Sequence, residues 1–173
     1  MRVAILVGNP NPRSRTRAVA HAVAQWICRR HDGEITQDID LIDYARNIFD
    51  SPNDEIDALN MAVAQSDVLV VASPTYKGTF TGLLKAFFDR CGNDGLAGVV
   101  AVPIMTAGSP LHGLAIDFAL RPLLVELGAS VPTRGLCFLV PSQMPELDDV
   151  VERWAAANLA ALAPAIRPSA EPG

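Results

Sequence analysis

Short apolar runs, each followed by a loop and then a helical pattern, constrain the fold of this chain more than any other feature. The strands expected at 3–7, 67–73 and 98–104 are built around such runs. An unbroken run of this length is typical of a strand that is buried on both faces, as in a parallel sheet. Helices must then cover both faces, so the pattern predicts an α/β fold with right-handed crossovers.

Five strand–helix pairs can be followed along the 173 residues. We expect strands at 3–7, 35–42, 67–73, 98–104 and 133–140, and helices at 14–30, 51–65, 81–90, 111–127 and 145–162. Pro122 predicts a kink or break within the fourth helix. Nothing divides the chain, so we expect one domain over 1–163 and a flexible tail over 164–173.

Charge and cysteine content exclude several classes of protein. The formal net charge of −5 argues against a nucleic-acid binder, which would carry a basic surface. The spacing of Cys28, Cys91 and Cys137 matches no zinc site, so we expect no metal, and three reduced thiols suit a reducing cytoplasm. The chain shows no signal-peptide pattern and no apolar run long enough to span a membrane.

Three loops follow the carboxyl ends of expected strands, at residues 8–16, 74–79 and 106–110. Doubly wound sheets bind their ligands at that edge, where the strand order reverses. If the strand order is 2-1-3-4-5, the first two loops flank the reversal and the third is their neighbour. We therefore expect the ligand site at these three loops.

The first loop, GNPNPRSRT, leads into a helix whose start carries Arg13, Arg15 and Arg17. A cation there costs about 0.3–1 kcal/mol, because the unpaired N–H groups already carry partial positive charge. A bound phosphate would reverse this cost, since the N–H groups, the hydroxyls of Ser14 and Thr16 and one or two arginines would all hold it. The loop by itself equally permits solvated arginines and a Ser14 that only caps the helix.

Gly8, at the end of the first strand, would let the backbone turn close to such a ligand. The loop contains neither G-x-G-x-x-G nor a Gly-Lys pair, so it is not the usual dinucleotide or nucleoside-triphosphate loop. No G-x-S-x-G segment is present either, and a hydrolase triad therefore lacks its nucleophile.

The second loop, SPTYKGTFTG, is shaped by Pro74 and Gly78 and projects Thr75, Tyr76 and Lys77 from the end of a central strand. Such a loop offers backbone donors and an aromatic edge to a planar ring. The third loop, TAGSP, has small side chains that would let backbone N–H groups approach a ring closely. It can also be interpreted as an ordinary strand-to-helix turn.

The chain resembles the NADPH-dependent FMN reductases in three segments: GNPNPRSRTRAV, ASPTYKGTFTGLLKAFFD and TAGSPLHGLAIDFALRPLLVELGA. The order and spacing are most similar to those of the reductases that supply reduced flavin to alkanesulfonate monooxygenases, and the resemblance covers about residues 2–140. It implies a flavodoxin-like three-layer sandwich, with a five-stranded parallel sheet in order 2-1-3-4-5. It also implies a homodimer or homotetramer.

The resemblance implies that the first loop holds the FMN phosphate and that the other two loops line the ribityl chain and the ring. The chain departs from the family pattern at Asn9, where serine is usual, and at Phe118, where close relatives often carry tyrosine. The expected cofactor-binding residues are Gly8, Arg13, Ser14, Arg15, Thr16, Pro74, Thr75, Tyr76, Lys77, Gly78, Thr106, Ala107 and Gly108.

The implied activity is the reduction of FMN by NADPH or NADH. The cofactors supply the reactivity in hydride transfer, so we assign no catalytic residue. Three other readings stay open: a quinone or azo-compound reductase on the same fold, an electron carrier like flavodoxin, and a flavin-binding module without turnover. Expected partners are FMN, the pyridine nucleotide, further copies of the chain and a flavin-dependent monooxygenase, but not nucleic acid or a membrane.

Overall fold

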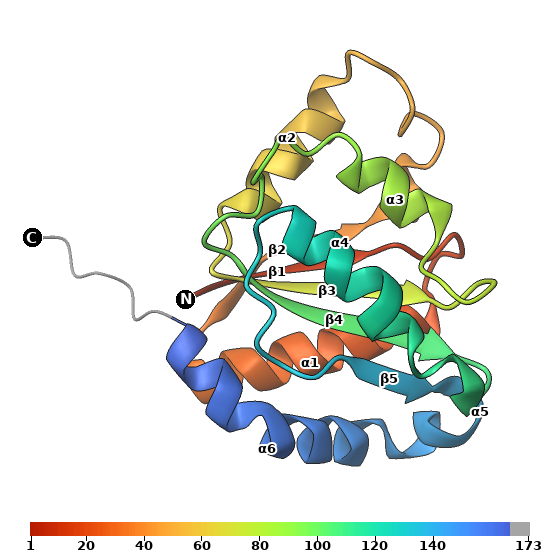
Figure 1. Ribbon diagram of the computed structural model, residues 1–173, viewed down its shortest axis with the longest axis vertical. Coiled ribbons are helices and arrows are strands. Elements are labelled where there is room, and N and C mark those ends of the chain that lie inside the picture. Colours follow the sequence, from red (N-terminus) through yellow and green to blue (C-terminus); the bar gives the residue numbers. More distant parts are fainter. Residues whose placement is uncertain (167–173) are drawn as a thin grey trace, which may run out of the picture.

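The computed structural model describes residues 1–166 and contains one parallel sheet of five strands in the order β2-β1-β3-β4-β5 (Figure 1). All neighbouring strands run parallel. The expected α/β class and strand order are thereby confirmed. The strands are β1 (Arg2–Val7), β2 (Glu34–Asp40), β3 (Val68–Pro74), β4 (Val100–Ala107) and β5 (Leu136–Leu139).

Helices cover both faces of the sheet and complete a three-layer sandwich (Figure 1). One face packs against α1 (Arg15–His31) and α6 (Leu147–Ala165). The other packs against α2 (Asp54–Ala64), α3 (Gly82–Phe88) and α4 (Arg121–Glu126). Shorter turns complete the chain: η1 (Leu41–Tyr44), η2 (Pro110–His112), η3 (Ile116–Leu120), α5 (Val140–Gln143) and η4 (Met144–Glu146).

The apolar runs explain which strands lie in the middle. All residues of β3 and β4 are buried, as is β1 after its first residue, because helices cover both sides of these strands. In β2, at the edge, exposed and partly buried residues alternate until the last two residues, which are buried. The carboxyl ends of β1, β3 and β4 therefore meet in the centre of one edge, and the three loops follow there.

The segment expected as one helix over 111–127 is broken into η2, η3 and α4, and η3 is a π-helix. Pro122 accounts for the π-helix, because it lacks the N–H that would bond to the carbonyl of Phe118 in an α-helix. The N–H of Arg121 instead bonds to the carbonyl of Ile116, five residues earlier. The proline therefore coincides with a π-helical segment directly before it rather than with a break: residues 115–126 are helical without interruption, and the interruption lies at residues 113–114.

Two strands and the chain end differ from expectation. β4 begins at Val100 and runs to Ala107, because Gly98 adopts a left-handed turn (φ +84°) and pairing with β3 continues to Thr106. β5 has four residues rather than eight, since the segment before it is held by side chains such as that of Asn158. α6 includes residues 164 and 165, which we expected in the tail, and 167–173 lie outside the described residues.

No helix within residues 1–166 combines the length and apolar character needed to cross a bilayer.

Candidate functional site

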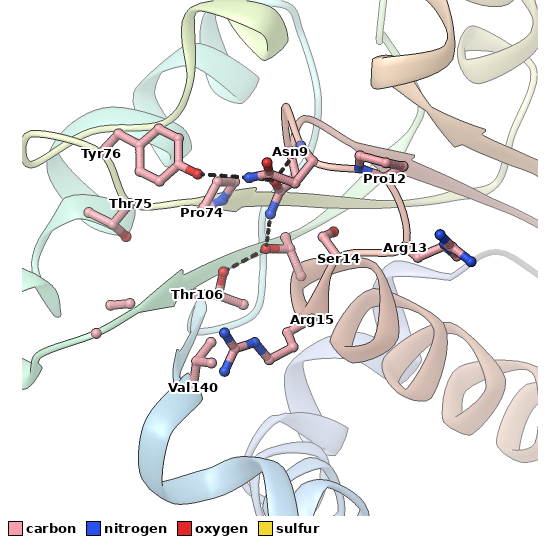
Figure 2. Close-up of a pocket in the computed structure, with 14 residues that line it drawn as sticks. Asn9, Pro12, Arg13, Ser14, Arg15, Pro74, Thr75, Tyr76, Thr106 and Val140 are labelled. Atoms are coloured by element: carbon pink, nitrogen blue, oxygen red, sulfur yellow. Dashed lines mark hydrogen bonds between the residues drawn. The ribbon is translucent and has the colours of Figure 1, made fainter.

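A cavity of about 550 Å³ opens where the three loops meet, at the carboxyl edge of the sheet (Figure 2). Ten of the thirteen expected cofactor-binding residues line it, from all three loops. The lining consists of Asn9, Asn11, Pro12, Arg13, Ser14, Arg15, Thr16, Pro74, Thr75, Tyr76, Thr106, Ala107, Gly108 and Val140. The structure thus brings together the segments 9–16, 74–76 and 106–108 with residue 140, which are far apart in the sequence.

The N-terminus of α1 forms one wall of this cavity. Ser14 has extended backbone geometry (φ −70°, ψ 156°), and its Oγ accepts a hydrogen bond of 3.2 Å from the N–H of Arg17, which makes it the N-cap. Its hydroxyl proton can still be donated to a ligand, because a hydroxyl both donates and accepts. Arg13, just before the cap, has φ +51°, so the backbone turns sharply before the helix begins.

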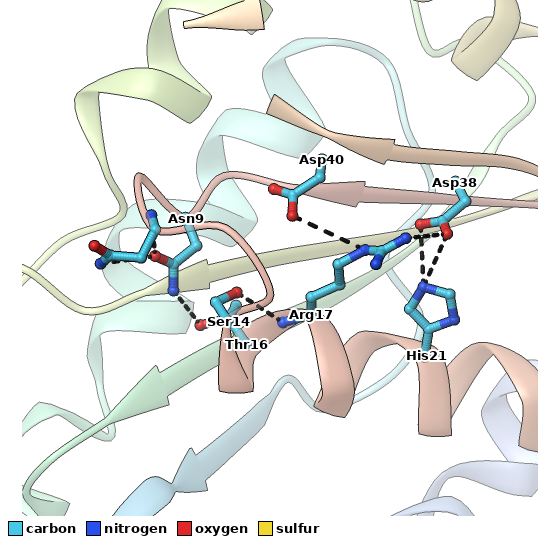
Figure 3. Close-up of polar contacts among 8 residues, drawn as sticks. Asn9, Ser14, Thr16, Arg17, His21, Asp38 and Asp40 are labelled. Atoms are coloured by element: carbon cyan, nitrogen blue, oxygen red, sulfur yellow. Dashed lines mark hydrogen bonds and ion pairs between the residues drawn. The ribbon is translucent and has the colours of Figure 1, made fainter. Parts of the chain in front are cut away.

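The three arginines at this helix end have different surroundings. Arg13 and Arg15 line the cavity, and neither guanidinium has a hydrogen bond or an ion pair with any residue in 1–166. Arg17 points the other way, toward β2, where its guanidinium pairs with Asp38 and its Nε lies 3.9 Å from Oδ2 of Asp40 (Figure 3). Two cations are therefore available to an anion, while the third is compensated by the protein itself.

Asp38 and Asp40 reach Arg17 because β2 lies beside β1 and ends near the start of α1. His21 also contacts Asp38, with Nε2 3.1 Å from a carboxylate oxygen. Burial raises the pKa of Asp40, and the N–H of Ile42 and the charge of Arg17 oppose that rise. This cluster lies outside the cavity lining.

In the second loop, a polar atom lacks a partner. The N–H of Thr75 donates to the carbonyl of Thr106 at 2.7 Å, which joins the second loop to the end of β4. The Oγ1 of Thr75 is buried and has no hydrogen-bond partner, and its residue lines the cavity. A buried hydroxyl without a partner costs free energy, so this atom favours a polar ligand at the site.

Lys77 and Gly78 do not line the cavity. They form the tip of a two-residue turn in which Tyr76 and Thr79 exchange both backbone hydrogen bonds, at 2.9 and 3.2 Å. Both tip residues have positive φ (+53° and +83°), as in the type I′ turns that connect hairpins. The turn carries them beyond the rim, and a ligand role for them stays a prediction.

Gly8 also lies outside the lining. A Cβ on Gly8 would stand 2.5 Å from the Cβ of Leu84, so the missing side chain makes room for α3. The backbone of Gly8 is already engaged: its N–H donates to Ala72 at 2.8 Å and its carbonyl accepts from the hydroxyl of Thr81 at 2.5 Å. Gly8 therefore sets the distance between the first loop and α3.

Four lining residues are missing from the expected set: Asn9, Asn11, Pro12 and Val140. Asn9 could have been found, because it lies two residues after the end of a buried strand, and a polar side chain that is buried normally has a partner. Asn11 reaches the hydroxyl of Tyr76 at 3.4 Å and so connects the first two loops (Figure 2). Val140 directly follows β5, whose end was expected at this residue, but the expected site included only the loops after the first, third and fourth strands.

These features fit a phosphorylated planar ligand. The helix N-terminus, Ser14, Arg13 and Arg15 offer donors and positive charge at one end, and the buried Thr75 hydroxyl offers a further polar contact. Small residues at the end of β4 leave space for a flat group. Among residues 1–166, no group of His, Cys, Asp and Glu side chains is arranged to hold a metal ion.

The fold and the position of the cavity define the class: a flavodoxin-like α/β protein with its ligand site at the β1/β3 reversal of strand order. A family profile described as NADPH-dependent FMN reductase matches residues 1–142. The chain belongs to this family, as its three sequence segments indicated. It is therefore an oxidoreductase that uses FMN, with NADPH or NADH as the reductant.

Individual relatives agree with this assignment. The chain is 35% identical to an FMN reductase (NADPH) of Pseudomonas putida over 139 residues, which are 79% of this chain and 70% of the relative. It is 43% identical over 75 residues to the NADH-dependent FMN reductase SfnF of Pseudomonas putida, covering 43% and 40% of the two chains. A solved apo NADH:FMN oxidoreductase superposes with a TM-score of 0.76 at 26% identity, covering 99% and 97%.

Proposed function

We propose that the cavity holds FMN with its phosphate at the N-terminus of α1 and its ring between the second and third loops. The observation that carries this is the group of donors without partners: the Arg13 and Arg15 guanidinium groups, the Ser14 hydroxyl proton and the buried Thr75 hydroxyl. When bound, the flavin supplies the hydride-accepting chemistry. The chain's residues bind and orient it.

Each wall of the cavity has a separate task in this proposal. Arg15, Ser14 and the first-turn N–H groups neutralise a dianion at the start of α1, and Arg13, whose side chain extends in the opposite direction to that of Arg15, adds positive charge at the rim (Figure 2). Thr75 and the end of β4 support the ring through short contacts. Tyr76, which is half exposed at the rim, can cover one ring edge while the other face stays open to the nicotinamide.

The experiment is a calorimetric titration with FMN, followed by assays of NADPH and NADH oxidation with and without added FMN. We expect saturable binding and flavin-dependent oxidation of at least one nucleotide. Lack of both would refute the proposal. Oxidation that requires a quinone or an azo dye as the final acceptor would instead favour the alternative reductase, and binding without oxidation would favour a flavin carrier.

We also propose that the chain forms a homo-oligomer through the segment after the third loop. Leu111, Leu114 and Phe118 are 89%, 65% and 77% exposed, which is unusual for large apolar side chains so close together. Their spacing of three and four residues suits one side of a helical segment. Light scattering on the purified protein should give a dimer or tetramer mass, and Phe118→Glu should lower it.

Two relatives are named as NADH-dependent FMN reductases and others as FMN reductases that use NADPH, so either nucleotide is a candidate reductant. We propose that reduced flavin leaves this chain for a flavin-dependent monooxygenase. Three free cysteines, with burial raising each thiol pKa, suit a reducing cytoplasm as the place where this happens. Coupled turnover with a purified monooxygenase would test the transfer.

A further inference from the structure

A buried chain of hydrogen bonds lies in the wall of the cavity and joins the first loop to β4 (Figure 2). The Nδ2 of Asn9 donates to Oγ1 of Thr16 at 2.8 Å, and Oγ1 of Thr16 lies 2.7 Å from Oγ1 of Thr106. These residues are only 6%, 1% and 4% exposed. All three residues line the cavity, so the whole chain of hydrogen bonds lies at the ligand site.

The orientation of the Asn9 amide is determined by its neighbour. The backbone N–H of Asn11 donates to Oδ1 of Asn9 at 2.9 Å. A backbone N–H can only donate, so the oxygen of Asn9 must face Asn11 and the NH₂ group must face Thr16. Oγ1 of Thr16 therefore accepts a hydrogen bond from Asn9 and cannot use Asn9 as an acceptor.

The Thr16–Thr106 pair has one hydroxyl proton more than the hydrogen bond between the two residues needs. Thr16 and Thr106 carry two hydroxyl protons, and only one can lie between their oxygens. Within residues 1–166, neither oxygen has any other hydrogen-bond acceptor. Whichever threonine donates to the other, one proton is left over, and it can be donated only into the cavity.

We propose that Asn9 is a positioning residue that gives the Thr16–Thr106 pair its donor character toward the ligand. The acceptor it serves is an oxygen or unprotonated nitrogen of the flavin nucleotide, so the inference rests on the proposed function. An acceptor group at position 9 would take the proton of Thr16, and Thr106 would then donate to Thr16. No hydroxyl proton would remain for the ligand.

Asn9→Asp tests this directly, because aspartate keeps the shape of asparagine and replaces the donor by an acceptor. Its nearer oxygen can still accept from the N–H of Asn11. The added charge also repels a phosphate, so Asn11→Asp serves as the matched control. It puts the same charge in the same loop without touching Thr16.

The measurement is the FMN dissociation constant for the wild type, Asn9→Asp, Asn11→Asp, Thr16→Val and the double variant Asn9→Asp/Thr16→Val. We expect Asn9→Asp to weaken FMN binding about 10- to 150-fold, which is the range for the loss of one hydrogen bond to a charged acceptor. Asn11→Asp should weaken it only about two- to fivefold. With Thr16 replaced by Val, the loss of FMN affinity caused by Asn9→Asp should fall to that of Asn11→Asp, because the hydrogen bonds that link Asn9 to Thr106 are already broken.

Melting temperatures of all variants show whether each one is folded. An equal loss from Asn9→Asp with and without the Thr16 hydroxyl would overturn the inference, as would equal losses from the two aspartate variants. Wild-type protein that does not bind FMN in the same titration would refute the proposed function itself. Failure of the inference and failure of the function are therefore distinguishable.

Discussion

Replacing Arg15 with alanine should weaken FMN binding far more than replacing Arg17. Arg15 lines the cavity and has no ion pair within residues 1–166, so a phosphate would be its partner. A hydrogen bond to a charged group contributes about 1.5–3 kcal/mol, which corresponds to a loss of about 10- to 150-fold in affinity. Arg17 already has Asp38 and Asp40 as partners.

The effect of Arg17→Ala can be bounded from its place on the helix. Its guanidinium faces Asp38 on β2 rather than the cavity, so its distance from the phosphate position is on the order of 10 Å, about one Debye length at 0.1 M salt. At that distance in water, a charge and a dianion interact by about 0.8 kcal/mol before salt screening. We therefore expect a loss of less than about threefold at physiological salt, with an unfolding cost of about 0.2–1 kcal/mol for the partly exposed pair.

Calorimetric titration of FMN into both variants, at low and at physiological salt, measures the two effects. The loss in Arg15→Ala should persist at the higher salt, and the small loss in Arg17→Ala should shrink. Equal losses in the two variants would refute the division of the arginines, and so would unchanged binding by Arg15→Ala. Urea unfolding of each variant separates binding from stability.

Three further substitutions test other parts of the structure. Gly8→Ala should destabilise the fold by about 1–3 kcal/mol in urea unfolding, because the new Cβ would meet Leu84 at 2.5 Å; unchanged stability would show that α3 moves freely. Arg13→Gly should raise the free energy of unfolding by about 0.5–1 kcal/mol, because the φ of +51° at residue 13 is unfavourable for arginine and not for glycine. The same variant should bind FMN more weakly, and urea unfolding and FMN titration should therefore change in opposite directions. Burial raises the pKa of Asp40 above its ordinary value of 3.8, so the folded protein loses stability as the pH rises from 3.8 through the raised pKa. Asp40→Asn should therefore gain melting temperature relative to wild type as the pH is raised above 3.8, and a constant difference would contradict this.

Local patterns revealed the sheet and most of the cavity. Buried parallel strands need apolar side chains on both faces, so 3–7 and 67–73 could be located from the sequence alone. Ser14 could be placed because N-caps depend on neighbours only three residues away. Ten lining residues follow from these elements and from the rule that ligands bind at the carboxyl edge.

The remaining features depend on partners that are distant in the sequence. The role of Arg17 is set by Asp38 and Asp40 on the neighbouring strand, and that of Gly8 by Leu84 on α3. The π-helical segment depends on Pro122, which predicted a kink or break but not this form. Predicting these features requires knowing which residues of neighbouring strands and helices lie side by side, and composition and spacing do not give that information.

The pairing between β3 and β4 has a consequence for changing what this site accepts. It extends to Pro74 and Thr106, and the N–H of Thr75 adds one more bond to the Thr106 carbonyl. The second and third loops are therefore held at a fixed distance from each other where they leave the sheet. In residues 76–79, by contrast, the backbone hydrogen bonds join Tyr76 only to Thr79. This turn can therefore be replaced without breaking the bonds between β3 and β4. Attempts to change which ligands the site accepts should begin with these four residues.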